Sequence, residues 1–506
     1  MQIDFATYKD KVMGCWAGGN IGYVLGQPIK GKSVYSPVEY FTQDLSNGPP
    51  PNEDMGRLLV WLSAAERFGK RLDASILGEY WLSNIIPAKT EYGVAKSNLT
   101  AGLMPPLSGY LHNHSAKTCY FFGRPELWAC LSPGRPYMAA WYAFEDAKVD
   151  CAGESIYASV FIAALESAAF SENDTRKLVN IGLSYIPLDC AVAWCVKKAM
   201  ECYDGGMALC DAMQSINNYL LNVKYMAAGS QNNNKIMTAD APAYNLPANI
   251  GYIIAGLLYG EGDFGKSICA AASCGNEAGY NAATLGSILG IAYGASNLPE
   301  KWRAPVNDMI TIIWGPQTVS EFIDPILRIT PLFLGIEHCD ILADKGYKIS
   351  CLEGGELYRQ SEGTALSCRE ADNIYDYTRC ASFPDASPYV AIHIFPTCRV
   401  FINYGENIFF NPGSVRAIEI TVENHAIPYQ PLWCKIKAYA PENIQFINGP
   451  VCEMHLGGQE GKTGACIYEI DASNYYGGRL EILLDISFAG RHTCNPVKIT
   501  LLKRGN

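Results

Sequence analysis

Two short polar segments contain the residue types that could hold a cation or a sugar. The first is Asn52, Glu53 and Asp54, which follow three prolines and precede an apolar run with helical spacing. The second is Asn276 and Glu277, which follow a glycine and precede another apolar run. Such side chains commonly cap helix N-termini. Their oxygens are also the ligands that Mg²⁺ and Ca²⁺ require, so each segment is either a helix cap or part of a cation site.

The two segments could form one site if the fold brings them together. Each one begins a helix that is largely apolar, and helices of that kind lie in the interior of a domain. Two polar helix starts that meet in space would line one pocket with oxygen atoms. We therefore predict that the segments converge, and this prediction fails if Asp54 and Glu277 lie on opposite sides of the molecule.

The elements that must position these residues are helices. From residue 8 to about residue 314, apolar residues recur at spacings of three and four. The stretches 155–170, 250–259 and 282–293 are apolar almost all round, which predicts helices in the centre of a bundle. Five glycines within residues 14–28 would weaken a helix unless its backbone packs closely against a neighbour. We expect that helix to lie deep and to end near the pocket.

The pattern changes in the last third of the chain. Residues 341–387 are polar and lack sustained periodicity, which favours a connecting region. Seven short runs rich in β-branched and aromatic residues follow, with turn residues between them. We predict an all-α helical bundle at residues 1–340, a connecting region at 341–387 and an antiparallel β-sandwich at 388–506. The sandwich contains no plausible active site, so packing or contact with a carbohydrate or partner is its expected role.

Composition narrows the class of protein. The chain has 506 residues, of which 49% are hydrophobic and 18% charged, so it can bury more than one core. A net charge of -11 disfavours nucleic acid as a partner, because phosphate neutralisation needs clustered Lys and Arg. No apolar run approaches the roughly 20 residues of a membrane span, so no membrane contact is expected. The 19 cysteines form no CxxC pair and are interpreted as buried free thiols. We expect a cytoplasmic protein, or a periplasmic one if a leader was removed.

The order of these motifs resembles the ADP-ribosylglycohydrolase family over residues 8–314. The opening helix of the family matches at Gly14, Cys15, Trp16, Gly18, Gly22, Leu25, Gly26 and Pro28. The acidic loop of the family aligns with Asn52, Glu53 and Asp54, and its late acidic segment aligns with Gly275, Glu277, Gly279, Ala282, Ala283 and Gly286. A pocket-wall segment is similar to Arg124, Pro125, Glu126, Leu127 and Trp128.

The resemblance implies a site in which two acidic loops hold a pair of Mg²⁺ ions against a ribose. This sequence departs from that pattern, since Glu53 replaces an aspartate, while Gly56 and Gly279 stand where acidic residues are usual. Mg²⁺ demands near-ideal octahedral geometry, so each missing carboxylate weakens a site. We expect one Mg²⁺ or none rather than two, with Ca²⁺ as an alternative. The expected metal ligands are Asn52, Glu53, Asp54 and Glu277.

Other residues fall in the family's pocket regions. Cleavage of a glycosidic bond usually takes two carboxyl groups on opposite sides of the scissile oxygen. Asp146 and Asp150 are the strongest pair, because a spacing of four places both on one helix face. For each acid, the simpler interpretation is a surface group or a helix cap. The catalytic candidates are Glu91, Glu126, Asp146 and Asp150, and the substrate-binding candidates are Asn20, Arg124, Glu154, Asn276 and Asn281.

These observations favour a glycoside hydrolase that cleaves a ribosyl or other furanosyl bond. The expected partner is a small-molecule sugar or an ADP-ribose-like substrate, and the sequence leaves the oligomeric state open. The missing carboxylates support an alternative, which is a catalytically silent relative that binds a sugar or nucleotide and has a scaffold role.

Overall fold

The structure is a computed structural model of the chain. It describes residues 1–32, 34–85, 90–113, 115–116, 123–222, 246–312, 315–336, 346–359, 387–395, 397–424, 431–458, 462–490 and 494–504. The side chains of residues 53, 90–91 and 219–222 lie outside that description, which therefore excludes those of Glu53 and Glu91. The chain divides into two compact units. One comprises Met1–Gly93 and His112–Asp385, and the other comprises Val94–Leu111 and Ala386–Asn506.

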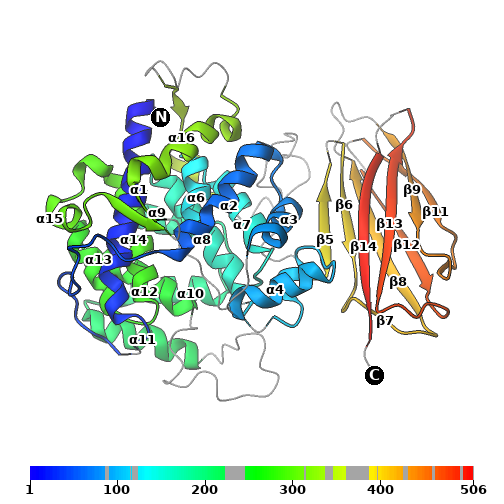
Figure 1. The fold of residues 1–506 in the computed structure, drawn as a ribbon, viewed down its shortest axis with the longest axis horizontal. Helices are drawn as coiled ribbons and strands as arrows, with labels where there is room; N and C mark the ends of the chain where they lie inside the picture. Colours follow the sequence, from blue (N-terminus) through cyan, green and yellow to red (C-terminus); the bar gives the residue numbers. More distant parts are fainter. Residues whose placement is uncertain are drawn as a thin grey trace. The chain divides into compact units, whose positions relative to one another are not determined.

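The first unit is a helical bundle (Figure 1). Two small antiparallel pairs accompany the helices: β1 (Gln2–Ile3) with β4 (Ile349–Ser350), and β2 (Met309–Ile312) with β3 (Gly315–Thr318). The helices are α1 (Phe5–Gly26), α2 (Glu53–Phe68), α3 (Ala74–Asn84), α6 (Arg124–Leu131), α7 (Pro136–Ala147), α8 (Glu154–Ala168), α9 (Thr175–Leu183), α10 (Ala191–Asp204), α11 (Leu209–Asn222), α12 (Leu246–Tyr259), α13 (Phe264–Ser273), α14 (Ala278–Tyr293), α15 (Glu300–Arg303) and α16 (Val319–Leu334). The predicted central helices at 155–170, 250–259 and 282–293 correspond to α8, α12 and α14.

Helices α1 and α14 touch through their backbones, and we call this contact the glycine seam. It joins Gly14, Gly18, Gly22 and Gly26 of α1 to Gly290, Gly286, Ala282 and Ala278 of α14, respectively. The pairing runs in opposite directions along the two helices, so they are antiparallel. A Cβ atom on Gly22 would lie 2.0 Å from the carbonyl oxygen of Ala282, and one on Gly14 would lie 2.1 Å from that of Gly290. The glycines predicted to allow close packing therefore do so at every fourth residue of α1.

The seam fixes where the loops at its end lie. Because Gly26 meets Ala278, the segment that follows α1 lies beside the segment that precedes α14. Two backbone hydrogen bonds join these segments: Gly31 N–H donates to Asn276 O, and Asn276 N–H donates to Lys32 O, both at 2.7 Å. Asn276 adopts a left-handed conformation with φ of 54°, which Asn tolerates better than most residues. The start of α14 is thus locked to the end of α1.

The second unit is a sandwich of two five-stranded sheets (Figure 1). One sheet has the order β10-β12-β8-β6-β5 and the other β11-β9-β13-β14-β7. Their pairing is antiparallel except for the short β14–β7 contact. The strands are β5 (Val390–Ile394), β6 (Cys398–Asn403), β7 (Phe409–Phe410), β8 (Val415–Asn424), β9 (Leu432–Tyr439), β10 (Gln445–Phe446), β11 (Val451–Leu456), β12 (Thr463–Asp471), β13 (Arg479–Phe488) and β14 (Cys494–Lys503). The predicted fold class, a helical domain followed by an antiparallel sandwich, is confirmed.

The sandwich core also contains residues from far earlier in the chain. Leu103, Leu107 and Leu111, which lie within the range expected for the helical domain, are buried with the inward-facing residues of the strands. Helix α5 (Leu107–Tyr110) carries part of this segment, and α4 (Thr90–Thr100) crosses from one unit to the other. Helical periodicity identifies an apolar face but not the surface that covers it, so the sequence alone did not indicate this grouping.

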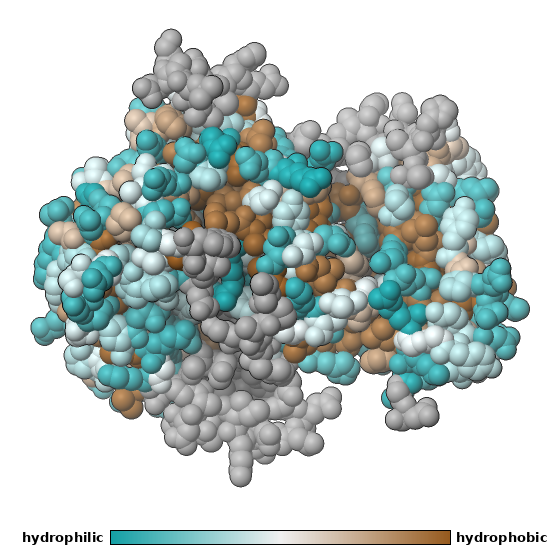
Figure 2. Space-filling view, viewed as in Figure 1, coloured by the Kyte–Doolittle hydropathy of each residue, from teal (hydrophilic) through white to brown (hydrophobic). Residues whose placement is uncertain are grey.

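The visible surface carries a mixture of hydrophilic and hydrophobic side chains on each unit (Figure 2). None of the helices that the structure describes is long and apolar enough to cross a lipid bilayer. All the cysteines recorded among the described residues are free, and most of them are buried, in agreement with the sequence-based expectation.

The glycine seam generates a stability prediction. Replacing Gly22 with Ala should lower the free energy of unfolding by about 3 kcal/mol or more, because the new methyl group would overlap the backbone of Ala282. Gly355→Ala is the matched control, since no atom lies within 4 Å of a Cβ there and its φ is not positive. Urea unfolding of both variants followed by circular dichroism would measure the difference, and equal stabilities would contradict the seam.

Candidate active site

The two acidic helix starts meet in the folded chain. Asp54, in the first turn of α2, accepts a hydrogen bond from the hydroxyl group of Tyr280, which lies in the first turn of α14. Asp54 is 8% exposed, so this contact is largely shielded from water. Burial raises the pKa of Tyr280 well above its usual range, and the charge of Asp54 adds to the effect, so Tyr280 keeps its proton and acts as the donor. Two segments far apart in the sequence thus share one hydrogen bond.

Asp54 is also held by a neighbour on its own helix and by an aromatic residue. Arg57, one turn later on α2, forms an ion pair with the Oδ1 atom of Asp54. The hydroxyl group of Tyr92 donates to the same oxygen at 3.3 Å, and the Arg57 guanidinium lies 4.8 Å from the Tyr92 ring centroid. Asn52 caps α2, because its side-chain oxygen accepts from the backbone N–H groups of Asp54 and Met55. The carboxyl group of Asp54 therefore has three side-chain donors around it.

Glu277 is paired with a cation from the end of α1. The Lys30 ammonium group lies 2.9 Å from the Oε2 atom of Glu277 and 4.5 Å from the centroid of the Tyr280 ring. The Lys30 and Glu277 side chains are 40% and 21% exposed, so this pair is nearer to solvent than the Asp54–Arg57 pair. Tyr280 links the two pairs, since its ring faces Lys30 and its hydroxyl group reaches Asp54.

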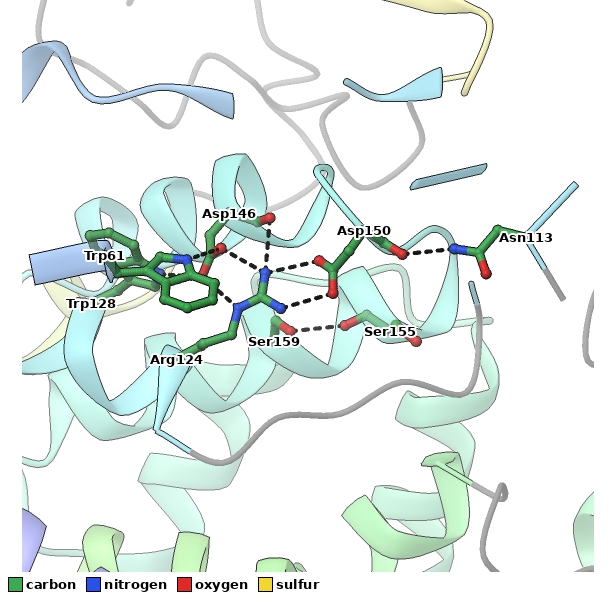
Figure 3. A network of polar contacts seen from close by, with 8 residues as sticks. All are labelled: Trp61, Asn113, Arg124, Trp128, Asp146, Asp150, Ser155 and Ser159. Carbon is green, nitrogen blue, oxygen red and sulfur yellow. Dashed lines mark hydrogen bonds and ion pairs between the residues drawn. The ribbon is translucent and has the colours of Figure 1, made fainter. Parts of the chain in front are cut away.

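A second polar network surrounds Arg124, the first residue of α6 (Figure 3). The guanidinium group donates to both side-chain oxygens of Asp146 at 2.9 and 2.6 Å and to both oxygens of Asp150 at 3.0 Å. The indole N–H groups of Trp61 and Trp128 donate to Asp146 at 2.6 and 2.9 Å. All five side chains are buried. Asp146 and Asp150 both face Arg124, but they do not share a helix face as the spacing predicted, because α7 ends at Ala147 and Asp150 lies in the turn that follows.

Aromatic rings join the two networks. Trp61 and Trp81 meet edge to face at 6.0 Å, and the Trp81 ring lies 5.4 Å from that of Tyr92. The Arg124 guanidinium lies 5.1 Å from the Trp61 ring. Burial raises the pKa of Tyr92, and the charges of Asp54 and Asp150 act in the same direction. The carboxyl groups of Asp54 and Asp150 therefore both lie within electrostatic reach of Tyr92.

A buried pair of glutamates lies behind α14. Glu126 accepts from the backbone N–H of Gly123 at 2.8 Å and from the Thr284 hydroxyl group at 3.1 Å. Burial raises its pKa to about 7. The side-chain oxygens of Glu166, on α8, have no hydrogen-bond partner among the described residues. Burial raises the pKa of Glu166 well above its usual range, and the nearby charge of Glu126 adds to this.

The remaining sequence-based candidates have structural partners. Both carboxyl oxygens of Glu154 accept backbone N–H groups at the start of α10, from Ala191 at 3.1 Å and Val192 at 3.0 Å. Asn20 donates to the carbonyl oxygen of Met309, and Asn281 donates to the side chain of Asn249. Glu154 is therefore a helix cap in this structure.

Four asparagines near these helix starts keep an unused polar atom. Asn20, Asn52, Asn276 and Asn281 are each about 1% exposed, yet one side-chain atom of each has no hydrogen-bond partner among the described residues. Buried polar atoms are normally satisfied, so these four positions could accept water or ligand hydroxyl groups. They remain candidates for substrate binding, while the side chains of Glu53 and Glu91 lie outside the described residues.

The resemblance implies a pair of metal ions, which the side-chain oxygens of the site would have to coordinate. A Mg²⁺ site needs several oxygen ligands in octahedral geometry, usually with carboxylates free to bind. Within the described part of the chain, no three His, Cys, Asp or Glu residues group closely enough to hold a metal ion. Asp54 and Glu277 are already paired with Arg57 and Lys30. The described residues therefore do not fit a binuclear metal centre.

Sequence analysis overlooked four residues of this site: Lys30, Arg57, Tyr92 and Tyr280. Arg57 lies three residues after Asp54, a spacing that places both on one helix face, so that pair could have been found. The contribution of Lys30 depends on the glycine seam, and that of Tyr280 on the approach of α2 to α14. Neither contact leaves a signal in local sequence.

Comparisons with known proteins found one matching family model and a weakly similar solved structure. A family model described as ADP-ribosylglycohydrolase matches residues 4–330. A solved structure titled "ADP-ribosylglycohydrolase-related protein complex" is similar over 65% of this chain and 100% of its own, with 14% sequence identity and a TM-score of 0.42. No curated protein sequence matches the chain.

The Arg124 network generates a second stability prediction. Arg124→Met should lower the free energy of unfolding by about 3 to 5 kcal/mol, because it leaves two buried carboxyl groups without their cation. Arg176→Met removes an ion pair with Asp204 in which both side chains are about half exposed, so it should cost about 1 kcal/mol or less. Denaturant unfolding at neutral pH would compare the two. Similar losses of unfolding free energy in the two variants would show that Arg124 contributes little to stability.

The buried glutamates predict a pH dependence. Glu126 has a folded pKa of about 7 against an ordinary value of 4.5, so the folded state holds a proton that the unfolded state has released. The stabilising contribution is complete below about pH 4.5 and is lost as the pH rises toward 7, by up to about 3 kcal/mol. Glu166 acts in the same direction.

Glu166→Gln should therefore flatten the stability profile and raise stability at pH 8 relative to pH 5. Thermal unfolding of the protein and this variant between pH 4.5 and 8.5 would measure the change. The exposed Glu66→Gln should follow the curve of the unaltered protein. Parallel curves for all three proteins would contradict a proton held at Glu166.

Proposed function

The chain belongs to the ADP-ribosylglycohydrolase family, and from this premise we propose that it is a glycoside hydrolase acting on a ribosyl or other furanosyl bond. The observation that carries the proposal is the hydrogen bond from Tyr280 to Asp54, which joins the two acidic helix starts. Family membership supports a hydrolase of glycosidic bonds in general. The sugar and the leaving group belong to the proposal.

Asp54 and Asp150 are the carboxyl groups that we assign to the chemistry. Asp54 is less buried than Asp146 and Asp150. Its neighbours Tyr280 and Tyr92 fix its orientation. Asp54 would accept a proton from the attacking water as the water oxygen bonds to the anomeric carbon. Burial raises the pKa of Asp150, which favours its protonated form, although Arg124 acts in the opposite direction. Asp150 would give its proton to the leaving group as the glycosidic bond breaks.

The other residues of the site would position these two. Arg124 and the Trp61 and Trp128 indoles hold Asp146, which keeps α6 and α7 in register beside Asp150. The unused amide atoms of Asn20, Asn52, Asn276 and Asn281 would bind sugar hydroxyl groups. Glu126 and its partner Thr284 would support α14 from behind.

A second function is favoured by a specific observation. Asp54, Glu277, Asp146 and Asp150 each have a basic partner, so these four carboxyl groups are all engaged within the chain. A site of this kind could bind a sugar or nucleotide without hydrolysing it, and the sandwich could then serve assembly. A direct assay separates the two functions.

The assay uses a panel of nitrophenyl furanosides, with ADP-ribose included in a parallel thermal-shift measurement. We expect release of nitrophenol by the unaltered protein and a fall in kcat/KM of about 10²- to 10⁴-fold for Asp54→Asn and for Asp150→Asn. Asp204→Asn, which alters an exposed ion pair between α9 and α10, is the control and should keep full activity. Circular dichroism would verify that each variant is folded.

The outcome also decides between the two functions. Hydrolysis that survives Asp54→Asn would refute the assignment of Asp54. An inactive protein that ADP-ribose nevertheless stabilises would identify the binding function instead, because a ligand at 100 times its Kd adds about 2.7 kcal/mol.

A further inference from the structure

We infer that the side chains of Lys30 and Arg57 supply the positive charge of this pocket and thereby exclude divalent cations from it. Each acidic helix start has its own basic partner, Glu277 with Lys30 and Asp54 with Arg57. The inference does not rest on the proposed hydrolysis, because it concerns ion binding and stability and can be tested on an inactive protein.

Lys30 occupies the position beside Glu277 that a cation would need. Its ammonium group lies 2.9 Å from a carboxyl oxygen, and its approach to the Tyr280 ring supplies a second favourable contact for a cation. Hydrogen bonds between Gly31, Lys32 and Asn276 anchor the backbone directly after Lys30, and the Lys30 N–H donates to the carbonyl oxygen of Gln27 at 3.2 Å. The anchored backbone therefore places the Lys30 side chain beside Glu277.

Arg57 does the same at Asp54 from within one helix. Its guanidinium group pairs with Oδ1, contacts the Tyr92 hydroxyl group at 3.3 Å and lies over the Tyr92 ring. Tyr280 takes the other oxygen, Oδ2. Both oxygens of Asp54 are therefore in use, and an ion could reach them only by displacing Arg57 or Tyr280.

Gly279 has no side chain and so supplies no carboxylate ligand. A Cβ atom at this position of α14 would lie 3.0 Å from the side-chain nitrogen of Gln27, so a carboxylate there would have to shift the Gln27 side chain. Asn52 uses its carbonyl oxygen to cap α2. Asp54 and Glu277 are thus the only carboxylates that the described side chains of the two helix starts offer, and both are already paired with a basic group.

Charge balance leads to the same conclusion. The four side chains Asp54, Glu277, Arg57 and Lys30 sum to no net charge when all are ionised. A divalent ion placed among them would leave an excess of two positive charges in a partly buried site, where repulsion is weakly screened. The ion would therefore have to expel at least one of the two basic side chains.

The first experiment measures ion binding by the unaltered full-length chain. Thermal unfolding would be followed in EDTA and in millimolar Mg²⁺, Mn²⁺ or Ca²⁺, and bound metal would be counted after equilibrium dialysis. We expect the same melting temperature under all conditions and no bound ion. Binding of a divalent ion that is lost in Asp54→Asn or Glu277→Gln would overturn the inference.

The second experiment removes the basic side chains. Lys30→Met combined with Arg57→Met should lower the melting temperature in EDTA, because it leaves two carboxyl groups without a cation. Mg²⁺ or Mn²⁺ should then restore several degrees and appear as a bound ion. The charge-conserving pair Lys30→Arg and Arg57→Lys is the matched control and should show no response to metal.

Adding Glu277→Gln to the double variant should abolish the response again. If the double variant does not fold, Lys30→Met alone decides, since that side chain is 40% exposed. A folded variant that lacks these basic groups and still shows no response to metal would contradict the inference, because it would mean that Lys30 and Arg57 are not what excludes the ion.

Discussion

The backbone contact between α1 and α14 is the constraint on which the site depends. At each fourth residue of α1 a glycine meets a carbonyl oxygen of α14 so closely that a methyl group would overlap it. This contact sets the translation of one helix along the other, and Gly26 is thereby placed against Ala278. Lys30 and Glu277 follow from that register, since each lies only a few residues beyond the seam. A shift of one helical turn would separate them by about 5 Å.

The register of α1 against α14 brings the polar side chains of the site into contact. Tyr280 reaches from α14 to Asp54 on α2, so a third helix is tied to the pair. The Trp61, Trp81 and Tyr92 rings then connect Asp54 to Arg124 and its two aspartates. Aromatic walls lower the local dielectric, which strengthens each ion pair and raises the cost of leaving any member alone. Asp54, Arg57 and Trp61 are spaced three and seven residues apart on α2, so both networks contact the same face of that helix.

Sequence reasoning located the helices, the strands and the meeting of the acidic segments, because these leave periodic or compositional signals. It recovered seven of the sandwich strands, but the two-residue strands β7 and β10 are too short to show a period, and the alternating strand β11 (VCEMHL) was overlooked. It identified Asp54 but not Tyr280, whose role depends on how α2 approaches α14. Glu154 was expected at the substrate, whereas its carboxyl group is occupied by the N-terminus of α10. Long-range partners of this kind follow from packing rather than from spacing.

The same residues serve two requirements that oppose each other, since a carboxyl group that anchors helices cannot move freely in a reaction. Asp150 is fully buried and held at two points by Arg124, which fixes the orientation of its carboxyl group but restricts its movement. Asp54 is held by three donors but retains some exposure, which suits contact with a substrate. A hydroxyl-bearing ligand can replace the Tyr92 hydroxyl group at Asp54, at 3.3 Å, with less loss than the Arg57 ion pair. Access to Asp54 thus depends on its weakest contact, and the basic residues need not leave.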